Sequence, residues 1–142
     1  MITNLLEGKK GIIFGALNSK SIAWHVAEKA HEQGAHLVLT NAPVAIRMGT
    51  IAELAEKTGS EVISADATSM KDLEALFMKS MEIFDGKVDF VLHSIGMSPN
   101  VRKGIPYAEI SYENMLKTLD ISALSFHRIL QTAYKLDAIR EW

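Results

Sequence analysis

The residues best placed to do chemistry near the start of this chain are a glycine and a serine separated by five residues. Residues 11–14 form a short apolar run typical of a buried strand, and Gly15 ends it. A polar loop leads to Ser21, after which small or apolar side chains recur at helical spacing. Gly15 can adopt a positive φ and permits close approach, because it has no Cβ. Ser21 occupies an N-cap position, so its hydroxyl and the first N–H groups of the helix are predicted to face a phosphate.

The same stretch also fits an ordinary strand-to-helix turn that a serine caps. The pattern Gly-x5-Ser-Ile-Ala lacks the second and third glycines of the Gly-x-Gly-x-x-Gly dinucleotide fingerprint. On this stretch alone, both a phosphate-binding turn and an ordinary serine-capped turn therefore stay open. The rest of the sequence is needed to choose between them.

Predicted strands and helices alternate along the chain. The strands are predicted at residues 11–14, 35–40, 61–65 and 88–93. Helices are predicted after Ser21, from residue 51 to Gly59, after Ser69 and, as one long helix following a loop over residues 94–110, after Ser111. This alternation predicts an α/β fold with a Rossmann-like, doubly wound parallel sheet and right-handed crossovers. We expect one domain over residues 1–142 that holds the first four βα units of such a sheet.

In a sheet of this kind, ligands bind beyond the carboxyl ends of the strands, where the strand order reverses. The residues that follow the predicted strands are Gly15, Asn41-Ala42, Asp66-Ala67 and His93-Ser94-Ile95-Gly96. Asp66 could accept a hydrogen bond from an adenine amino group or cap the helix near Ser69. Ser94 to Gly96 could let a ribose and nicotinamide pass close to the backbone, or could form a plain turn. His93 is predicted to be a packed histidine at a strand end, because the sequence offers it no evident carboxylate partner.

The composition excludes several classes of function. The chain has 142 residues, 48% hydrophobic and 23% charged, which is enough for one domain with a core. Its formal net charge of −2 gives no general attraction to nucleic acid or to an anionic membrane. It has no cysteine, charged residues interrupt any signal-like apolar run near Met1, and no run reaches membrane-spanning length. We therefore expect a soluble, cytoplasmic protein with no metal site, no nucleic-acid partner and no membrane contact.

Four segments together resemble the NADH-dependent enoyl-acyl-carrier-protein reductases of type II fatty-acid synthesis, a divergent group of short-chain dehydrogenase/reductases. They are Gly15-x5-Ser21-Ile22-Ala23, Asp66-Ala67, His93-Ser94-Ile95-Gly96 and Asp120-Ile121-Ser122-x2-Ser125-Phe126. The resemblance runs in register from about Leu6 to about Leu136. The segments His93-Ser94-Ile95-Gly96 and Asp120-Ile121-Ser122-x2-Ser125-Phe126 are fairly specific to this family. The sheet pattern, in contrast, is shared with many dehydrogenases.

The resemblance implies which positions hold the cofactor and the enoyl-acyl-carrier-protein substrate. The implied cofactor-binding residues are Gly15, Ser21, Ile22, Ala42, Asp66, Ala67, Ser94, Ile95 and Gly96. The first three match the pyrophosphate-binding turn, Asp66 and Ala67 match adenine contacts, and the last three match the segment along the ribose and nicotinamide. Ser98 falls where a backbone group meets the acyl substrate. The helix that contains residues 120–126 is implied to contribute to a subunit interface and to the floor of the cofactor site, and such enzymes usually form homotetramers.

The end of the second predicted strand bears on the choice of cofactor. Asn41-Ala42 stands there, so no Asp or Glu can hold a ribose 2′-hydroxyl. A 2′-phosphate would require a nearby arginine, and Arg47 is the one candidate within several residues. NADH is the predicted cofactor, and NADPH stays an alternative.

The resemblance also implies a catalytic tyrosine, with a lysine six or seven residues later, on a fifth strand and the helix after it. The sequence stops at Trp142, where that strand is expected to begin, so we predict no catalytic residue and no reductase activity in this chain alone. Tyr112 and Lys117 come nearest to the pair, but a spacing of i to i+5 places them on different helix faces. The fourth strand is then expected to lack a neighbour on one side.

Two other function classes fit parts of the pattern. A non-catalytic NAD(P)-binding module, or another short-chain dehydrogenase/reductase, would keep the phosphate-binding turn. A phosphoreceiver domain would use Asp66 as its phosphoacceptor, but it needs acidic metal ligands after the first strand, where Gly15-Ala16 stands.

Overall fold

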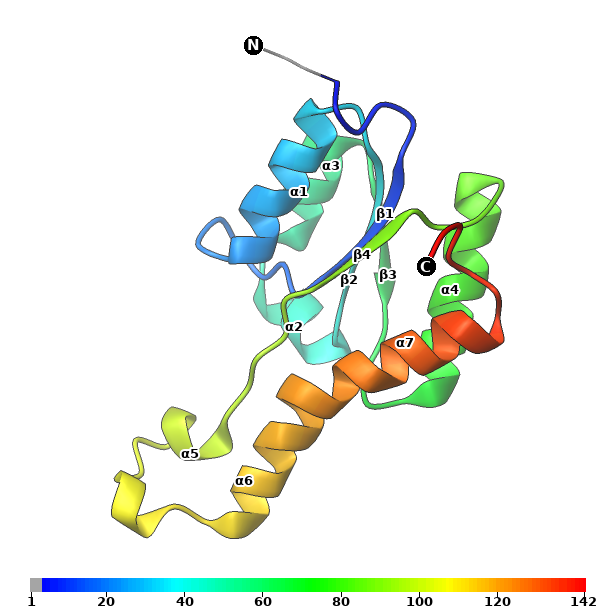
Figure 1. The fold of residues 1–142 in the computed structure, drawn as a ribbon. Helices are drawn as coiled ribbons and strands as arrows, with labels where there is room; N and C mark the ends of the chain where they lie inside the picture. The colour runs from blue at the N-terminus through cyan, green and yellow to red at the C-terminus, as the bar shows by residue number, and fades with distance from the viewer. Residues whose placement is uncertain (1–3) are drawn as a thin grey trace.

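A four-stranded parallel sheet organises the computed structural model, which describes residues 4–142 (Figure 1). The strands are β1 (Lys10–Phe14), β2 (His36–Asn41), β3 (Glu61–Ser64) and β4 (Phe90–His93). Their order is β3-β2-β1-β4, and all three pairings are parallel. The chain therefore winds from β1 to one side of the sheet and returns to the other side for β4. This confirms the predicted Rossmann-like sheet.

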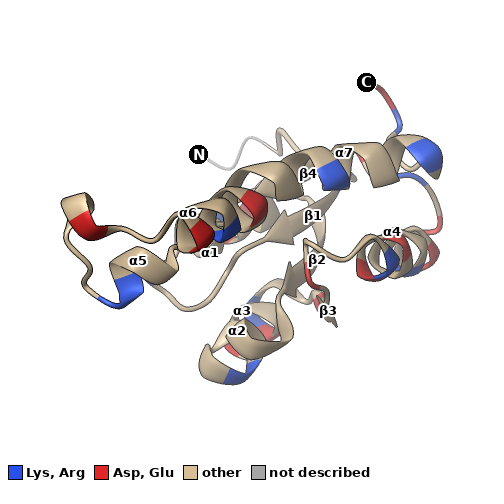
Figure 2. Ribbon diagram, turned by 90° about the horizontal axis from the view of Figure 1, so that it is seen from below, with Lys and Arg blue, Asp and Glu red and all other residues tan. Residues whose placement is uncertain are grey.

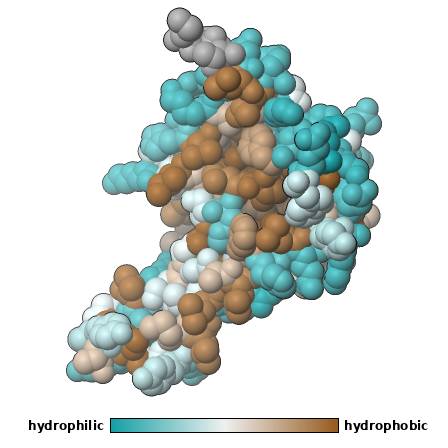
Figure 3. Space-filling model, in the orientation of Figure 1, coloured by the Kyte–Doolittle hydropathy of each residue, from teal (hydrophilic) through white to brown (hydrophobic). Residues whose placement is uncertain are grey.

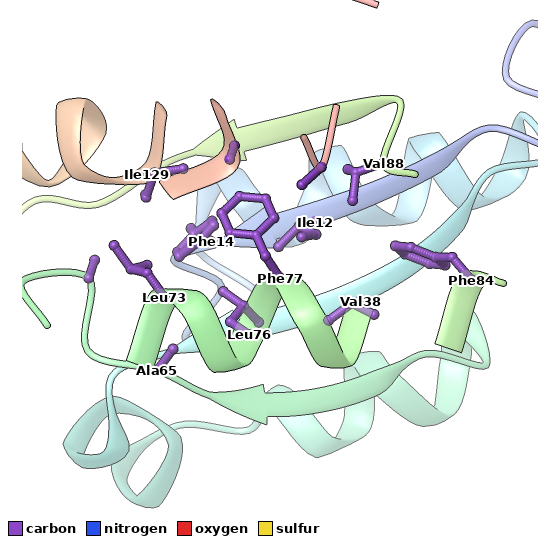
Figure 4. Packing of buried hydrophobic residues seen from close by; sticks show 13 residues of the cluster. Ile12, Phe14, Val38, Ala65, Leu73, Leu76, Phe77, Phe84, Val88 and Ile129 are labelled. Carbon is purple, nitrogen blue, oxygen red and sulfur yellow. The ribbon is translucent and has the colours of Figure 1, made fainter. Parts of the chain in front are cut away.

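Helices cover both faces of the sheet, as the alternation of elements predicts (Figure 1). On one face lie α1 (Ile22–Glu32) and α3 (Ile51–Thr58), and on the other lie α4 (Met70–Phe84) and α7 (Ser125–Lys135). The side chains of successive β1 residues point to opposite faces of the sheet. Ile13 belongs to the cluster under α1 and α3, whereas Ile12 and Phe14 belong to the cluster under α4 and α7. Figure 4 shows Phe77 of α4 reaching between Phe14 and Ile12 in this second cluster.

The predicted helix ends are confirmed at several points. The Ser69 hydroxyl accepts the Asp72 N–H at the start of α4, and the Ser111 hydroxyl accepts the Asn114 N–H at the start of α6 (Tyr112–Leu119). Gly59 ends α3 in the left-handed conformation at φ 62°. Such caps satisfy N–H and C=O groups that the helix itself leaves unpaired.

The segments between these elements contain short helices that the sequence pattern did not specify. Residues 43–48 form α2 (Pro43–Met48), with proline in its first turn. The predicted loop over residues 94–110 contains α5 (Pro99–Arg102) and a 3₁₀ turn at Tyr107–Glu109. Each is too short for a hydrophobic period to identify it.

The long helix predicted after Ser111 is interrupted by a π-helical turn, η2 (Asp120–Leu124), between α6 and α7. The Ser125 N–H reaches back to the Asp120 carbonyl, five residues earlier. The predicted apolar face is not buried along much of its length. Ile129 is buried, but Leu116 and Leu124 are 68% and 53% exposed. Together α5 and α6 form an arm that projects from the sheet, with apolar atoms on its surface (Figures 1 and 3).

The strand β4 forms an edge of the sheet, as expected. It is shorter than predicted at its start, because Val88 pairs with Ile139 in an isolated parallel bridge instead of joining β1. A groove of about 240 Å³ runs beside β4, with His93, Phe126 and Trp142 among its lining residues. Across residues 4–142, no helix combines the length and apolar character needed to cross a membrane.

Candidate functional site

The parallel strands bring the predicted site residues to one edge of the sheet. Gly15 follows β1, Ala42 follows β2, Asp66 comes two residues after β3, and Ser94 follows β4. The strand order reverses between β1 and β4, which is where a doubly wound sheet opens a crevice for ligands. Figure 2 looks at the molecule from this end and shows most of the charged residues on the surrounding helices.

Gly15 has the predicted positive φ, at 99°. A Cβ built on Gly15 would lie 1.9 Å from the Ser94 carbonyl oxygen, so the close approach that glycine permits is made by the chain itself. The Gly15 N–H donates to the Thr40 carbonyl at 3.2 Å. The turn after β1 is therefore fixed between the ends of β2 and β4, and a side chain there would push these ends apart.

Ser21 occupies the predicted N-cap position of α1, but its hydroxyl makes no capping hydrogen bond to that helix, so this is not the ordinary serine-capped turn of the competing interpretation. Its oxygen accepts hydrogen bonds from the backbone N–H groups of Leu17 and Asn18, at 3.0 and 3.2 Å. These two bonds occupy both acceptor positions and leave the hydroxyl proton free to donate. The first turn of α1 has no side-chain cap and no acidic residue. The start of this helix therefore offers N–H groups and a positive dipole end to an anion.

Asp66 does not cap α4, because Ser69 does so. One Asp66 carboxylate oxygen accepts the N–H and the hydroxyl of Thr68, at 2.8 and 2.7 Å. The carboxylate is exposed at the edge of the sheet, and the Asp66 N–H is held by the Asp72 side chain at 3.0 Å. The neighbouring residue Ala67 is buried, at 7% exposure.

Asn41 braces the edge in a way that sequence reasoning missed. Its amide donates to the Ala16 carbonyl at 2.9 Å, and its side-chain oxygen accepts the Ala42 N–H at 2.9 Å. The Asn41 side chain thus joins the turn after β1 to the start of α2. An asparagine at a strand end is a weak signal for such a brace, because the same residue is common in ordinary turns.

His93 is the packed strand-end histidine that the sequence predicts. Its Nε2 lies 2.8 Å from the hydroxyl of Ser125, and its ring meets the ring of Phe126 edge-on with centroids 5.6 Å apart. Burial lowers the pKa of His93 below its usual value. Because the Ser125 hydroxyl donates to the Ile121 carbonyl, it accepts from a neutral His93 that carries its proton on Nε2.

The segment after His93 leaves the sheet edge toward α5. Ile95 packs against the core below α4, whereas Gly96 is exposed with open space around it. Ser98 lies at the N-cap of α5, and its hydroxyl accepts the Val101 N–H at 3.4 Å. Ser122 holds the backbone of Met97, a contact that the sequence pattern did not predict.

The tyrosines lie on the outer surface of the molecule. Tyr107, Tyr112 and Tyr134 are 87%, 81% and 74% exposed. Tyr134 contacts Trp142, with ring centroids 6.0 Å apart. In the part of the chain that the structure describes, no group of three or more acidic or histidine side chains is placed to hold a metal ion.

Comparison with known sequences and structures places this chain among relatives. The sequence model of the family described as "Enoyl-(Acyl carrier protein) reductase" matches residues 15–141. The enoyl-[acyl-carrier-protein] reductase [NADH] 1 of Rhizobium meliloti is 33% identical over 132 residues, which cover 92% of this chain and 48% of that protein. The chain thus spans about half the length of the curated relatives it matches.

The fold is also similar to solved structures. The FabI–NADH complex from Alistipes finegoldii is 64% identical, with a TM-score of 0.95, and the match covers 98% of this chain and 49% of that one. The Bacillus cereus enoyl-acyl carrier protein reductase, solved with NADP⁺ and an indole naphthyridinone, is 28% identical, with a TM-score of 0.82, and the match covers 95% and 52%.

Proposed function

The chain belongs to the enoyl-(acyl carrier protein) reductase family, and on that premise we propose that residues 1–142 form the cofactor-binding half of an NADH-dependent reductase. The substrate in this proposal is the trans-2-enoyl group carried by acyl-carrier protein, and the compartment is the cytoplasm. One observation carries the proposal. At the uncapped start of α1, the Ser21 hydroxyl has both acceptor positions filled and its proton free.

The start of α1 is the proposed pyrophosphate site. The Ser21 hydroxyl donates to one phosphate oxygen, while the N–H groups of Ile22 and Ala23 face the same anion at the positive end of an eleven-residue helix. Gly15 keeps the turn after β1 tight against Ser94, so the pyrophosphate lies where the strand order reverses. An anion fits here because the first turn of α1 carries no acidic side chain.

The ends of β2 and β3 form the proposed adenosine site. The exposed Asp66 carboxylate accepts the adenine amino group, and the Ala67 backbone contacts the ring. Ala42 lies beside the adenosine ribose, at the N-cap of α2. Asn41 is bound to Ala16 and Ala42, so its amide braces this site instead of gripping a ribose hydroxyl.

NADH is the proposed cofactor because, among residues 4–142, no ion pair or side-chain hydrogen bond holds Arg47 beside this ribose position. Arg47, the one candidate to bind a 2′-phosphate, lies exposed in the last turn of α2. The NADH complex of the 64% identical Alistipes finegoldii FabI supports the same choice. NADPH is the alternative, and the Bacillus cereus relative was solved with NADP⁺.

The segment from Ser94 to Gly96 is the proposed contact for the nicotinamide half of the cofactor. Gly96 is exposed and open, so a ring can approach its backbone closely. The backbone at Ser98, two residues further along, faces the acyl substrate in this proposal. When bound, the cofactor supplies the hydride for the β-carbon of the enoyl group.

This proposal assigns no residue among 4–142 to the proton transfer that accompanies reduction of the enoyl group. Tyr112 and Lys117 both lie exposed on the projecting arm, and the other tyrosines are also on the outer surface. We therefore expect a polypeptide of these 142 residues to bind NADH without reducing a crotonyl thioester. The loss of NADH absorbance measures this directly, and turnover by the purified polypeptide would contradict it.

The arm and α7 form the proposed contact with further copies of the chain in a homotetramer. Their exposed apolar side chains include Leu116, Leu119, Leu124, Phe126 and Leu130. Burying such residues in a subunit interface stabilises an assembly. Light scattering on Leu116→Glu should show a lower mass than the unmodified chain. Leu5→Glu, which places the same charge at an exposed leucine before β1, outside the arm and α7, should not.

Calorimetric titration with NADH and NADPH tests the proposed cofactor site. NADH should bind, and Ser21→Asp should abolish binding, because a carboxylate at this position repels the pyrophosphate. Ser111→Asp is the matched control, since it places the same charge at the N-cap of α6, a position that aspartate suits well. A folded chain that binds no NADH would overturn the proposal, and so would unchanged binding by Ser21→Asp. Binding without turnover by the complete natural protein would favour the alternative of a non-catalytic NAD(P)-binding module.

A further inference from the structure

Two serines of the long helix hold the two ends of the short segment that follows β4. Ser122 lies inside the π turn η2, and Ser125 directly follows it. They contact Met97 and His93, the residues on either side of the segment Ser94–Gly96. The helix thus contacts the residues at both ends of this segment, while Ile95 in its middle packs against the core.

Ser122 binds the backbone of Met97 twice. Its hydroxyl oxygen accepts the Met97 N–H at 3.0 Å, and the hydroxyl donates to the Met97 carbonyl at 3.2 Å. A single side chain therefore satisfies both backbone groups of one residue. No other hydrogen bond of the Met97 backbone occurs among residues 4–142.

Ser125 holds the other end through a side chain. It is fully buried, it donates to the Ile121 carbonyl at 2.6 Å, and it accepts from Nε2 of His93 at 2.8 Å. Because His93 also forms the last pair of β4 with β1, at Phe14, this contact ties the helix to the end of the strand.

The π turn sets the helical phase that makes both contacts available. It inserts one residue into the turn, and without it every later side chain would rotate by about 100° around the axis. Ser125 and the buried Ile129 would then both turn away from β4. The side chain of Arg128 reaches back to the carboxylate and carbonyl of Asp120 and so braces the turn.

A third contact holds the segment Ser94–Gly96 against the turn after β1. The Ser94 carbonyl lies where a Cβ of Gly15 would be, at 1.9 Å from that ideal position. The segment is therefore packed against the turn that leads to Ser21. A shift of Ser94 away from His93 would disturb this turn as well.

We propose that Ser122 and Ser125 are positioning residues for cofactor binding. They set the place of Ser94–Gly96 at the carboxyl edge of the sheet, while the fold itself depends on the apolar clusters elsewhere. The inference rests on the proposed function, because it assigns the segment to the nicotinamide half of a dinucleotide. Loss of either hydroxyl lets the segment move, and the bound cofactor then has to order it again.

The test compares NADH affinity with stability in matched variants. Ser122→Ala should weaken NADH binding about tenfold, which corresponds to about 1.4 kcal/mol, and leave the thermal unfolding midpoint unchanged. Ser122→Thr, which keeps the hydroxyl, should restore the affinity. Thr118→Ala is the control, because it removes a hydroxyl from the same helix that bonds only to the Asn114 carbonyl. Ser125→Ala should weaken binding by a similar factor.

Amide hydrogen exchange in the free chain gives a second measurement. The Met97 amide should exchange about tenfold faster in Ser122→Ala, while the amides of β1 keep their rates. Equal NADH affinity in Ser122→Ala and the unmodified chain would overturn the inference, and so would an equal loss in Thr118→Ala or no recovery in Ser122→Thr. An unmodified chain that binds no NADH would instead overturn the proposed function, and this inference with it.

Discussion

Gly15 offers a measurable test of how tightly the carboxyl edge of the sheet is packed. In Gly15→Ala, a residue with a side chain has to hold φ at 99°, which costs about 1–2 kcal/mol. The new Cβ also lies 1.9 Å from the Ser94 carbonyl oxygen, so backbone has to move, which costs about 1–3 kcal/mol more. We expect a total loss of about 2–5 kcal/mol in the free energy of unfolding.

Gly59 provides a control that separates the two contributions. It also has a positive φ, 62°, but a Cβ built there meets nothing within 4 Å. Gly59→Ala should therefore show only the backbone cost of about 1–2 kcal/mol. Urea unfolding followed by circular dichroism gives both values. Equal losses in the two variants would refute the argument, because they would mean that the contact between Gly15 and Ser94 carries no energetic cost.

The remaining predictions concern the ends of the strands and the acid response. Asn41→Leu removes two hydrogen bonds of the Asn41 side chain and leaves the Ala16 carbonyl unpaired, so urea unfolding should show a loss of about 1–3 kcal/mol. Although burial raises the pKa of Asp89, hydrogen bonds from the Lys10 N–H and Arg140 outweigh it and hold this pKa below its ordinary value of 3.8. A lowered native pKa stabilises the fold above pH 3.8, and this stabilisation is lost as the pH falls through the native pKa. The free energy of unfolding should accordingly drop steeply below pH 3.8 in the unmodified chain and less steeply in Asp89→Asn.

The sequence predicts the fold well because the sheet is buried on both faces. Ile12, Ile13 and Phe14 form a continuous apolar run, and all three are buried at 1% exposure or less. Such a run identifies a central parallel strand whatever surrounds it. The boundaries are predicted less well where tertiary pairing decides them. Val88 lies two residues before the apolar run of β4, but its backbone pairs with Ile139, fifty-one residues later, which no local pattern reveals.

The long helix shows why its interior could not be predicted. Its apolar positions fit one continuous helical period, which indicates a single buried face. The π turn at Asp120–Leu124 shifts that phase, so Ile129 is buried while Leu124 is 53% exposed. The contact between Arg128 and Asp120, eight residues apart on the same continuous helix, braces this turn and leaves no periodic trace in the sequence.

Among residues 4–142, four serines stand directly before a helix, and local rules predict the same role for each. Ser69, Ser98 and Ser111 fulfil it, because their hydroxyls accept N–H groups from the first turns of α4, α5 and α6. Ser21 does not, since its hydroxyl turns back to the loop and leaves the start of α1 uncapped. An uncapped helix start loses about 1 kcal/mol that a serine cap usually contributes. A serine that forgoes this stabilisation at α1, while the serines before α4, α5 and α6 keep it, breaks the local rule as residues at functional sites do. This exception therefore supports the proposed anion site more specifically than the glycine pattern does.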